Sequence, residues 1–110
     1  MAVKVKNIIP SKQLEDTQTN QHIASVKTMI DKVTATNTTG AAVTFSCNLV
    51  PSGGAVGDAN AIIKDKTVAA DETYACPELV GHVLEAGDAI SMIASAAASL
   101  TIRASGREVT

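Results

Sequence analysis

The chain has 110 residues and a formal net charge of −2, and hydrophobic residues make up 45% of it while aromatic residues make up only 2%. This length fits one domain, and alanine, with 18 residues, is the largest part of the hydrophobic fraction. With so many alanines and so few aromatic residues, the core must be thin, which excludes an aromatic-lined cofactor cavity, a deep enzyme pocket and a base-stacking platform. The negative net charge disfavours nucleic acid as a partner.

The first 24 residues differ from the rest of the chain. Between residues 11 and 22, Leu14 is the only large apolar side chain. We therefore expect residues 1–24 to form an extended arm that is ordered by contact with another subunit, and residues 25–110 to form the folded domain. A short edge strand over residues 3–9, followed by a surface loop, remains an equal alternative. The candidate protein interface combines apolar and basic side chains of this segment: Val3, Lys4, Val5, Lys6, Ile8 and Ile9.

The next two segments show the period of two that is typical of β-strands. Residues 42–50 alternate apolar and polar side chains, which predicts a half-buried strand. Residues 24–36 change parity near Asp31 and Lys32, which indicates a β-bulge. The polar link Asn37 to Gly40 has the length of a hairpin loop, so we expect these two strands to pair antiparallel.

The remaining segments are short and are separated by turn residues. Glycines predict a long loop over residues 51–60. Strands are expected over 62–68, 73–76, 89–95 and 100–105, with a turn near residues 95–99 and an undecided segment, either a helical turn or a strand, over 78–83. Short strands at this spacing predict an all-β fold, namely an antiparallel β-sandwich or jelly roll of six to eight short strands with an extended N-terminal arm.

The residues that carry most enzyme and metal chemistry are isolated along this chain. His22 and His82 have no neighbouring ligand at a metal-binding spacing. Cys47 and Cys76 lack a CxxC arrangement, so we expect two buried reduced thiols, with a disulfide between them as the alternative. We expect no enzyme activity, no catalytic residue, no cofactor and no metal site. Neither a signal peptide nor a membrane span is evident, which predicts synthesis in the cytoplasm and no membrane partner.

Four short runs carry a resemblance that extends over residues 25–110: NT (37–38), LVPSGG (49–54), ADET (70–73) and LEAGD (84–88). The order and spacing of strands and turns that these runs mark resemble those of the small β-sandwich virion structural proteins of tailed bacteriophages. That family includes capsid decoration, or cement, proteins. The resemblance implies a homo-oligomer, with a trimer favoured, that binds the major capsid protein or other virion proteins and stabilises the capsid lattice.

The resemblance leaves the place in the virion open. A capsid decoration protein would use residues 1–24 to bind an acidic capsid surface, and deletion of residues 2–20 would then leave a folded domain that no longer binds capsids. A neck, collar or tail adaptor or fibre-anchoring protein is the first alternative. A small receptor- or carbohydrate-binding module, with residues 52–60 as its contact loop, is a more distant alternative.

Overall fold

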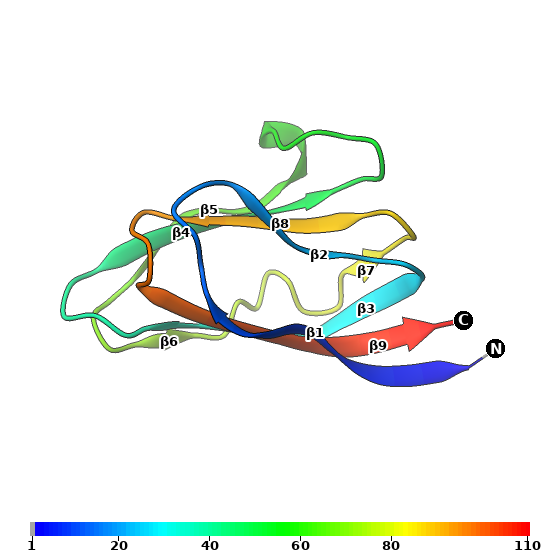
Figure 1. Cartoon of the computed structure of the whole chain (residues 1–110), viewed down its shortest axis with the longest axis horizontal. Helices are drawn as coiled ribbons and strands as arrows, with labels where there is room; N and C mark the ends of the chain where they lie inside the picture. The colour runs from blue at the N-terminus through cyan, green and yellow to red at the C-terminus, as the bar shows by residue number, and fades with distance from the viewer. Residues whose placement is uncertain (1) are drawn as a thin grey trace.

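The structure is a computed structural model that describes residues 2–110. Within that range the regular secondary structure is all β-strand apart from one short 3-10 helix, so the predicted all-β class is confirmed (Figure 1). The elements are β1 (Val3–Gln13), β2 (Thr19–Ile23), β3 (Lys27–Asn37), β4 (Val43–Val50), η1 (Asp58–Asn60), β5 (Ala61–Val68), β6 (Thr73–Tyr74), β7 (Val83–Leu84), β8 (Ala89–Ala94) and β9 (Leu100–Val109).

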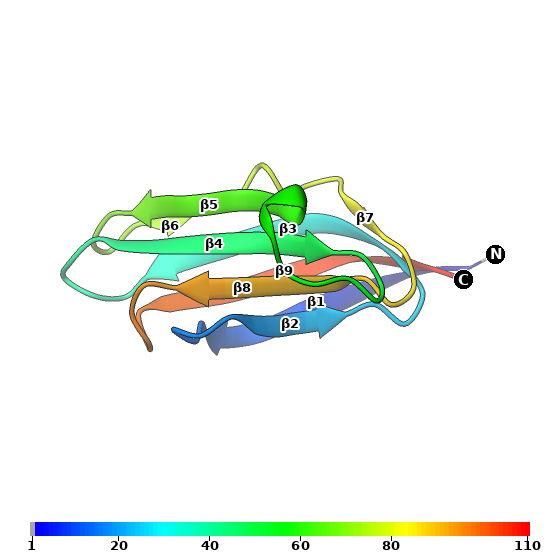
Figure 2. The ribbon, with the colours of Figure 1, turned by 90° about the horizontal axis from the view of Figure 1, so that it is seen from above.

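The strands form two antiparallel sheets that pack face to face. Sheet A has the order β1-β9-β3-β6, and β7 also pairs with β3; sheet B has the order β2-β8-β4-β5, with its strands side by side in Figure 2. The two-residue strands β6 and β7 occupy successive stretches of the same free edge of β3. Within residues 2–110 sheet A has five strands and sheet B has four, so the count of nine exceeds the predicted six to eight because β6 and β7 are separate short strands on one edge. With β6 and β7 taken as one edge position, this strand order is that of a jelly roll, which is one of the two predicted architectures.

Residues 1–24 were expected to be an arm, and this expectation is wrong for the described residues 2–24. Strand β1 pairs with β9, and β2 pairs with β8, so the segment supplies an edge strand to each sheet. Ile8, Ile9 and Leu14 are 3%, 1% and 1% exposed, which places all three in the core. Burial of these apolar side chains between the sheets holds the segment to its own chain. The edge-strand alternative is correct for residues 3–9, although the strand continues to Gln13.

The expected hairpin between residues 24–36 and 42–50 is also wrong, because β3 lies in sheet A and β4 in sheet B. The buried Asn37 side chain explains the crossing. Its amide nitrogen donates to the Ala41 carbonyl at 2.8 Å and to the Val68 carbonyl at 3.0 Å. These bonds hold the connection between β3 and β4 against the end of β5, which is in sheet B. The chain therefore crosses from sheet A to sheet B at this end of the core.

Other local predictions are confirmed. The register between β3 and β9 shifts between Ile30 and Lys32, where the parity change predicted a bulge. Residues 51–60 form a loop that ends in η1, and residues 95–99 form the turn between β8 and β9. Strand β9 runs beyond its predicted end, through Gly106 to Val109. This extension places Thr110 beside Ala2 at one end of the sandwich, where their backbones exchange hydrogen bonds of 2.8 and 2.9 Å.

Candidate functional site

The structure separates the six predicted interface residues into two groups. Val3 and Val5 are 58% and 85% exposed, and Lys4 and Lys6 are exposed too. Ile8 and Ile9 are in the core, so neither is available to a partner, and the prediction of an interface role for these two is wrong. The bulge between Asn7 and Ile9 turns both isoleucines inward, against the simple alternation of a strand. Only the first part of β1 remains as a candidate surface.

Val5 belongs to a row of side chains that crosses four strands of sheet A. Val5 on β1 lies opposite Arg107 on β9, which lies opposite Met29 on β3, which lies opposite Val83 on β7. Directly opposed residues point to the same face of a sheet. Because the neighbouring residue Ile30 is buried, this row lies on the outer face of sheet A, which sheet B does not contact.

A second row lies beside the first, closer to the termini. Here Val3 is opposite Val109, and Val109 is opposite Lys27. The two rows together bring five apolar side chains from four strands onto one end of the outer face. We call this surface the terminal patch; it consists of Val3, Val5, Met29, Val83 and Val109. Exposed apolar side chains that gather in this way mark an interaction surface more often than scattered ones do.

Arg107 occupies the middle of the terminal patch and is held in place by its neighbours. Its guanidinium donates to both carboxylate oxygens of Asp31, with contacts of 3.0 to 3.3 Å, and lies 3.2 Å from the Met29 sulfur. A forked contact of this kind fixes the plane of the guanidinium. The ion pair is exposed, so it adds little to stability. It balances the charge of Arg107 within the patch.

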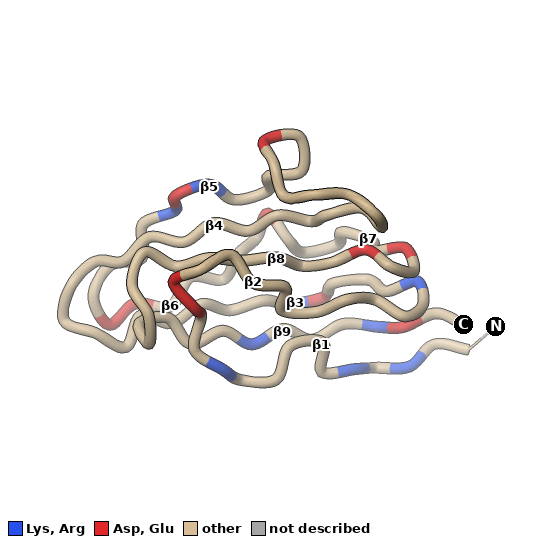
Figure 3. The backbone as a smooth tube through the Cα atoms, turned by 45° about the horizontal axis from the view of Figure 1, so that its top comes forward, with Lys and Arg blue, Asp and Glu red and all other residues tan. Residues whose placement is uncertain are grey.

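The charged residues are divided unequally between the strands of the two sheets and their connections. The strands of sheet A carry seven Lys and Arg residues and only two acids, Asp31 and Glu108. The other nine acids lie in β5 and in the connecting segments, as the red and blue segments in Figure 3 show. Four of the seven cations, Lys27, Lys32, Arg103 and Arg107, lie on the outer face of sheet A, whereas Lys4, Lys6 and Lys12 point to the other side of β1. An outer face with more cations than acids favours approach to an acidic partner.

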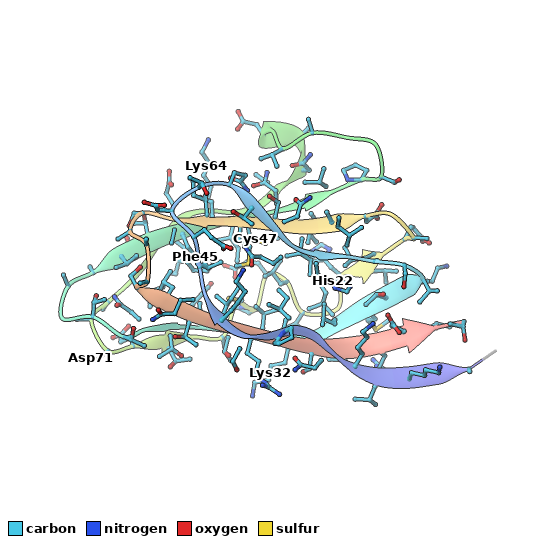
Figure 4. All side chains as sticks on the ribbon, viewed as in Figure 1. His22, Lys32, Phe45, Cys47, Lys64 and Asp71 are labelled. Atoms are coloured by element: carbon cyan, nitrogen blue, oxygen red, sulfur yellow. The ribbon has the colours of Figure 1, made fainter. Side chains whose placement is uncertain are left out.

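A second cluster lies on the other side of β1, at the rim of the core. The Lys6 ammonium contacts the Glu108 carboxylate at 3.0 Å, and the Glu108 side chain is only 12% exposed. His22 on β2, labelled in Figure 4, lies close enough to this pair for the charges of both Lys6 and Glu108 to act on its imidazole. Its Nε2 atom is buried and has no hydrogen-bond partner among residues 2–110. Burial, and then the positive charge of Lys6, lower the pKa of His22.

This lowered pKa predicts a loss of stability in mild acid. The unfolded chain takes up a proton on His22 as the pH falls through about 6.5, whereas the folded chain resists it, so the stabilisation present above that pH is lost below it. The urea midpoint should therefore fall between pH 7 and 5.5. The variant His22→Gln should flatten this decrease, and the exposed His82→Gln should retain it. An equal slope in the two variants would contradict the assignment to His22.

Residues with possible catalytic or metal-binding chemistry are not brought together in the described part of the chain. No group of three or more His, Cys, Asp and Glu residues within 2–110 is arranged to hold a metal ion. Cys47 and Cys76 are buried, free thiols, and burial raises the pKa of each to about 12. Such thiols stay protonated and are poor nucleophiles. No helix in the described range has the length and hydrophobicity needed to cross a bilayer.

The sequence contains only part of the signal for the terminal patch. Val3 and Val5 stand out because they alternate with lysines near the start of the chain. Met29, Val83 and Val109 come from three other segments, and each is an unremarkable residue until the strand registers are known. For Val109 a signal was present: the outward-facing positions Thr101, Arg103 and Ser105 continue with the same period through Arg107 to Val109, past Gly106.

Comparison with known proteins adds no relative: no protein-family model, no curated protein and no solved structure matches the chain.

Proposed function

We propose that this protein is a non-enzymatic structural protein of a tailed-bacteriophage virion, and specifically a capsid decoration protein that binds the major capsid protein lattice. The resemblance of residues 25–110 to small phage virion proteins supplies the class of protein. The terminal patch is the observation that supports a binding role, because Val3, Val5 and Val83 are exposed there and the half-buried Met29 and Val109 lie beside them on the outer sheet face. In this proposal the patch contacts the capsid, and the rigid jelly roll stands above it.

The edges of the sheets favour binding through a face over binding by strand addition. Strand β1 is an edge strand, and it contains Pro10, two register shifts and three lysines. Strand β5 at the edge of sheet B contains Lys64 and Lys66 around Asp65, whose φ is +50°. Proline, lysine and bulges are the features by which edge strands avoid pairing with other chains. A homo-oligomer, with a trimer favoured, would therefore associate through side chains.

Quantitative mass spectrometry of purified virions tests this proposal. A decoration protein is expected in hundreds of copies per particle, and antibody to the chain should label the capsid shell. About a dozen copies at one vertex would instead favour the neck or tail adaptor, because rings there contain few subunits. Absence of the chain from the particles would contradict both versions.

A pair of surface variants tests the role of the terminal patch itself. Val5→Asp introduces a charge within the terminal patch, beside Arg107, and should greatly reduce binding to capsids that lack the protein. Val56→Asp makes the same change at another exposed valine, in the loop before η1, and should bind as the native chain does. Circular dichroism establishes that both variants are folded. Equal binding by both would exclude the terminal patch as the contact.

A further inference from the structure

The outer face of sheet A contains a shallow hollow next to the terminal patch. Its volume is about 300 Å³, and it is lined by Lys32 and Thr34 on β3 and by Arg103 and Ser105 on β9. Lys32 lies opposite Ser105, and Thr34 lies opposite Arg103. The two cations are therefore diagonal neighbours, about 7 Å apart at the backbone. Figure 4 shows Lys32 pointing away from the sandwich, on the side of sheet A that faces away from the core.

These two cations differ from most others in sheet A in having no acidic partner. Within residues 2–110, four of the seven cations of this sheet form salt bridges: Lys6 with Glu108, Lys12 with Glu15, Lys27 with Glu85 and Arg107 with Asp31. Lys32 and Arg103 form none in the same range. Asp31, which precedes Lys32 in the chain, instead accepts hydrogen bonds from Nε and Nη2 of Arg107.

Arg103 lines the hollow from β9, and a hydrogen bond to the neighbouring strand fixes its side chain. Its Nη1 donates to the Ser11 hydroxyl on β1 at 3.2 Å, which holds the guanidinium on the β1 side of the hollow, across β9 from Lys32. Within residues 2–110 no side-chain hydrogen bond from its Nε or Nη2 is present, so these groups are able to donate to a ligand. The hydroxyl groups of Thr34 and Ser105 add two further donors to the floor of the hollow. A guanidinium, an ammonium and two hydroxyls that line one hollow from two neighbouring strands are suited to an oxyanion.

We propose that this hollow binds an Asp or Glu carboxylate of a partner protein, and that it sets the orientation of the chain on that partner. The inference rests on the proposed function, in which the partner is an acidic surface of the virion. The terminal patch favours a protein over a free anion or a nucleic acid, because it places apolar side chains directly beside the hollow. Ser105 lines the hollow, and Arg107, the next residue of β9 on the same face, lies opposite Met29 in the patch. A carboxylate flanked by apolar side chains on the partner would match the hollow and the patch together.

Titration of the isotope-labelled, full-length chain with hexaglutamate tests the site without needing the virion. Amide signals of residues 32–34 and 103–105 should shift, and the binding should weaken as salt is added. The double variant Lys32→Gln with Arg103→Gln should bind about tenfold more weakly or worse, because two charge-assisted contacts are lost. The matched control Lys64→Gln with Lys66→Gln removes the same charge from β5 and should leave the affinity unchanged.

Several results would overturn the inference. Equal weakening by both double variants would mean that net charge alone governs binding. Tighter binding at the hollow to a six-nucleotide single-stranded DNA of similar charge than to hexaglutamate would point to phosphate and against a protein carboxylate. Self-association that the Lys32 and Arg103 variant abolishes would make a second copy of this chain the occupant.

The virion separates failure of this inference from failure of the proposed function. If the double variant is incorporated at the native copy number, the chain is a virion protein but the hollow does not bind the capsid. If the native chain is absent from virions while hexaglutamate still binds at the hollow, the function proposed above is wrong and the carboxylate site remains.

Discussion

Replacing Ile9 with alanine is expected to destabilise the protein by about 2 to 5 kcal/mol, the range measured when a buried isoleucine or leucine is truncated. Ile9 is 1% exposed and lies opposite Ala104 in the pairing of β1 with β9. Its truncation leaves a cavity between β1 and the rest of the core. For a domain of this size, such a loss lowers the melting temperature by about 10 °C or more, which differential scanning calorimetry measures directly.

Val5→Ala is the matched control, because Val5 is on the same strand and is 85% exposed. Its free energy of unfolding should stay within about 0.5 kcal/mol of the native value. If Ile9→Ala costs no more than Val5→Ala, residues 2–13 are not part of the core and the arm predicted from the sequence is correct after all. Deletion of residues 2–20 is a poor test of binding, since it removes Ile8, Ile9 and Leu14 and should prevent folding.

The features that the sequence predicted are those set by neighbouring residues. Residues 43–47 alternate because one face of β4 packs on the core, and that pattern is visible without knowing what the strand pairs with. The bulge near Asp31 is visible for the same reason, since it changes the parity of buried side chains within a single strand. Glycine, proline and aspartate marked most turns correctly, because their backbone preferences are local.

The features that were mispredicted depend on contacts between distant residues. The Asn37 side chain crosses to the Val68 carbonyl, 31 positions away, and no pattern around Asn37 shows that its link joins two sheets instead of two adjacent strands. Ile8 and Ile9 are consecutive and both buried, because the bulge between Asn7 and Ile9 interrupts the alternation that would otherwise point one of them to the outer face. Their burial depends on β9, at the other end of the chain.

The candidate site shows the same division. Val3 and Val5 were identified from their own segment, whereas the rest of the terminal patch is assembled from β3, β7 and β9 by the strand registers. The hollow between Lys32 and Arg103 could not be seen at all before the register of β3 with β9 was known. A surface that spans several strands of an antiparallel sheet has no contiguous signature in the sequence.

Gly106→Ala is expected to cost about 3 kcal/mol, although the substitution adds a single methyl group. Gly106 lies in the middle of sheet A, between Lys6 on β1 and Ile30 on β3. A Cβ atom at this position would collide with the Met29 carbonyl oxygen and with Cδ1 of Ile8. The side chain of Ile8 is able to move, but the Met29 carbonyl is part of the β3 backbone, so β3 and β9 would have to separate.

Gly40→Ala is the control, because nothing lies within 4 Å of a Cβ added at Gly40 and its backbone is outside the left-handed region. Replacing a glycine at such a position restricts the unfolded chain and should leave stability unchanged or raise it by up to about 1 kcal/mol. Urea denaturation compares the two variants. Combining Gly106→Ala with Ile8→Ala should not restore stability, because the collision with the β3 backbone remains.

The same substitution connects the fold to the proposed interface. Gly106 separates Ser105, which lines the hollow, from Arg107, which lies in the terminal patch, so a distortion there displaces both surfaces. Under conditions in which Gly106→Ala is still folded, it should bind capsids more weakly than Gly40→Ala does. Unchanged binding by a folded Gly106→Ala protein would mean that the contact surface lies elsewhere on the sandwich, because an outer-face contact requires β1, β9 and β3 in register.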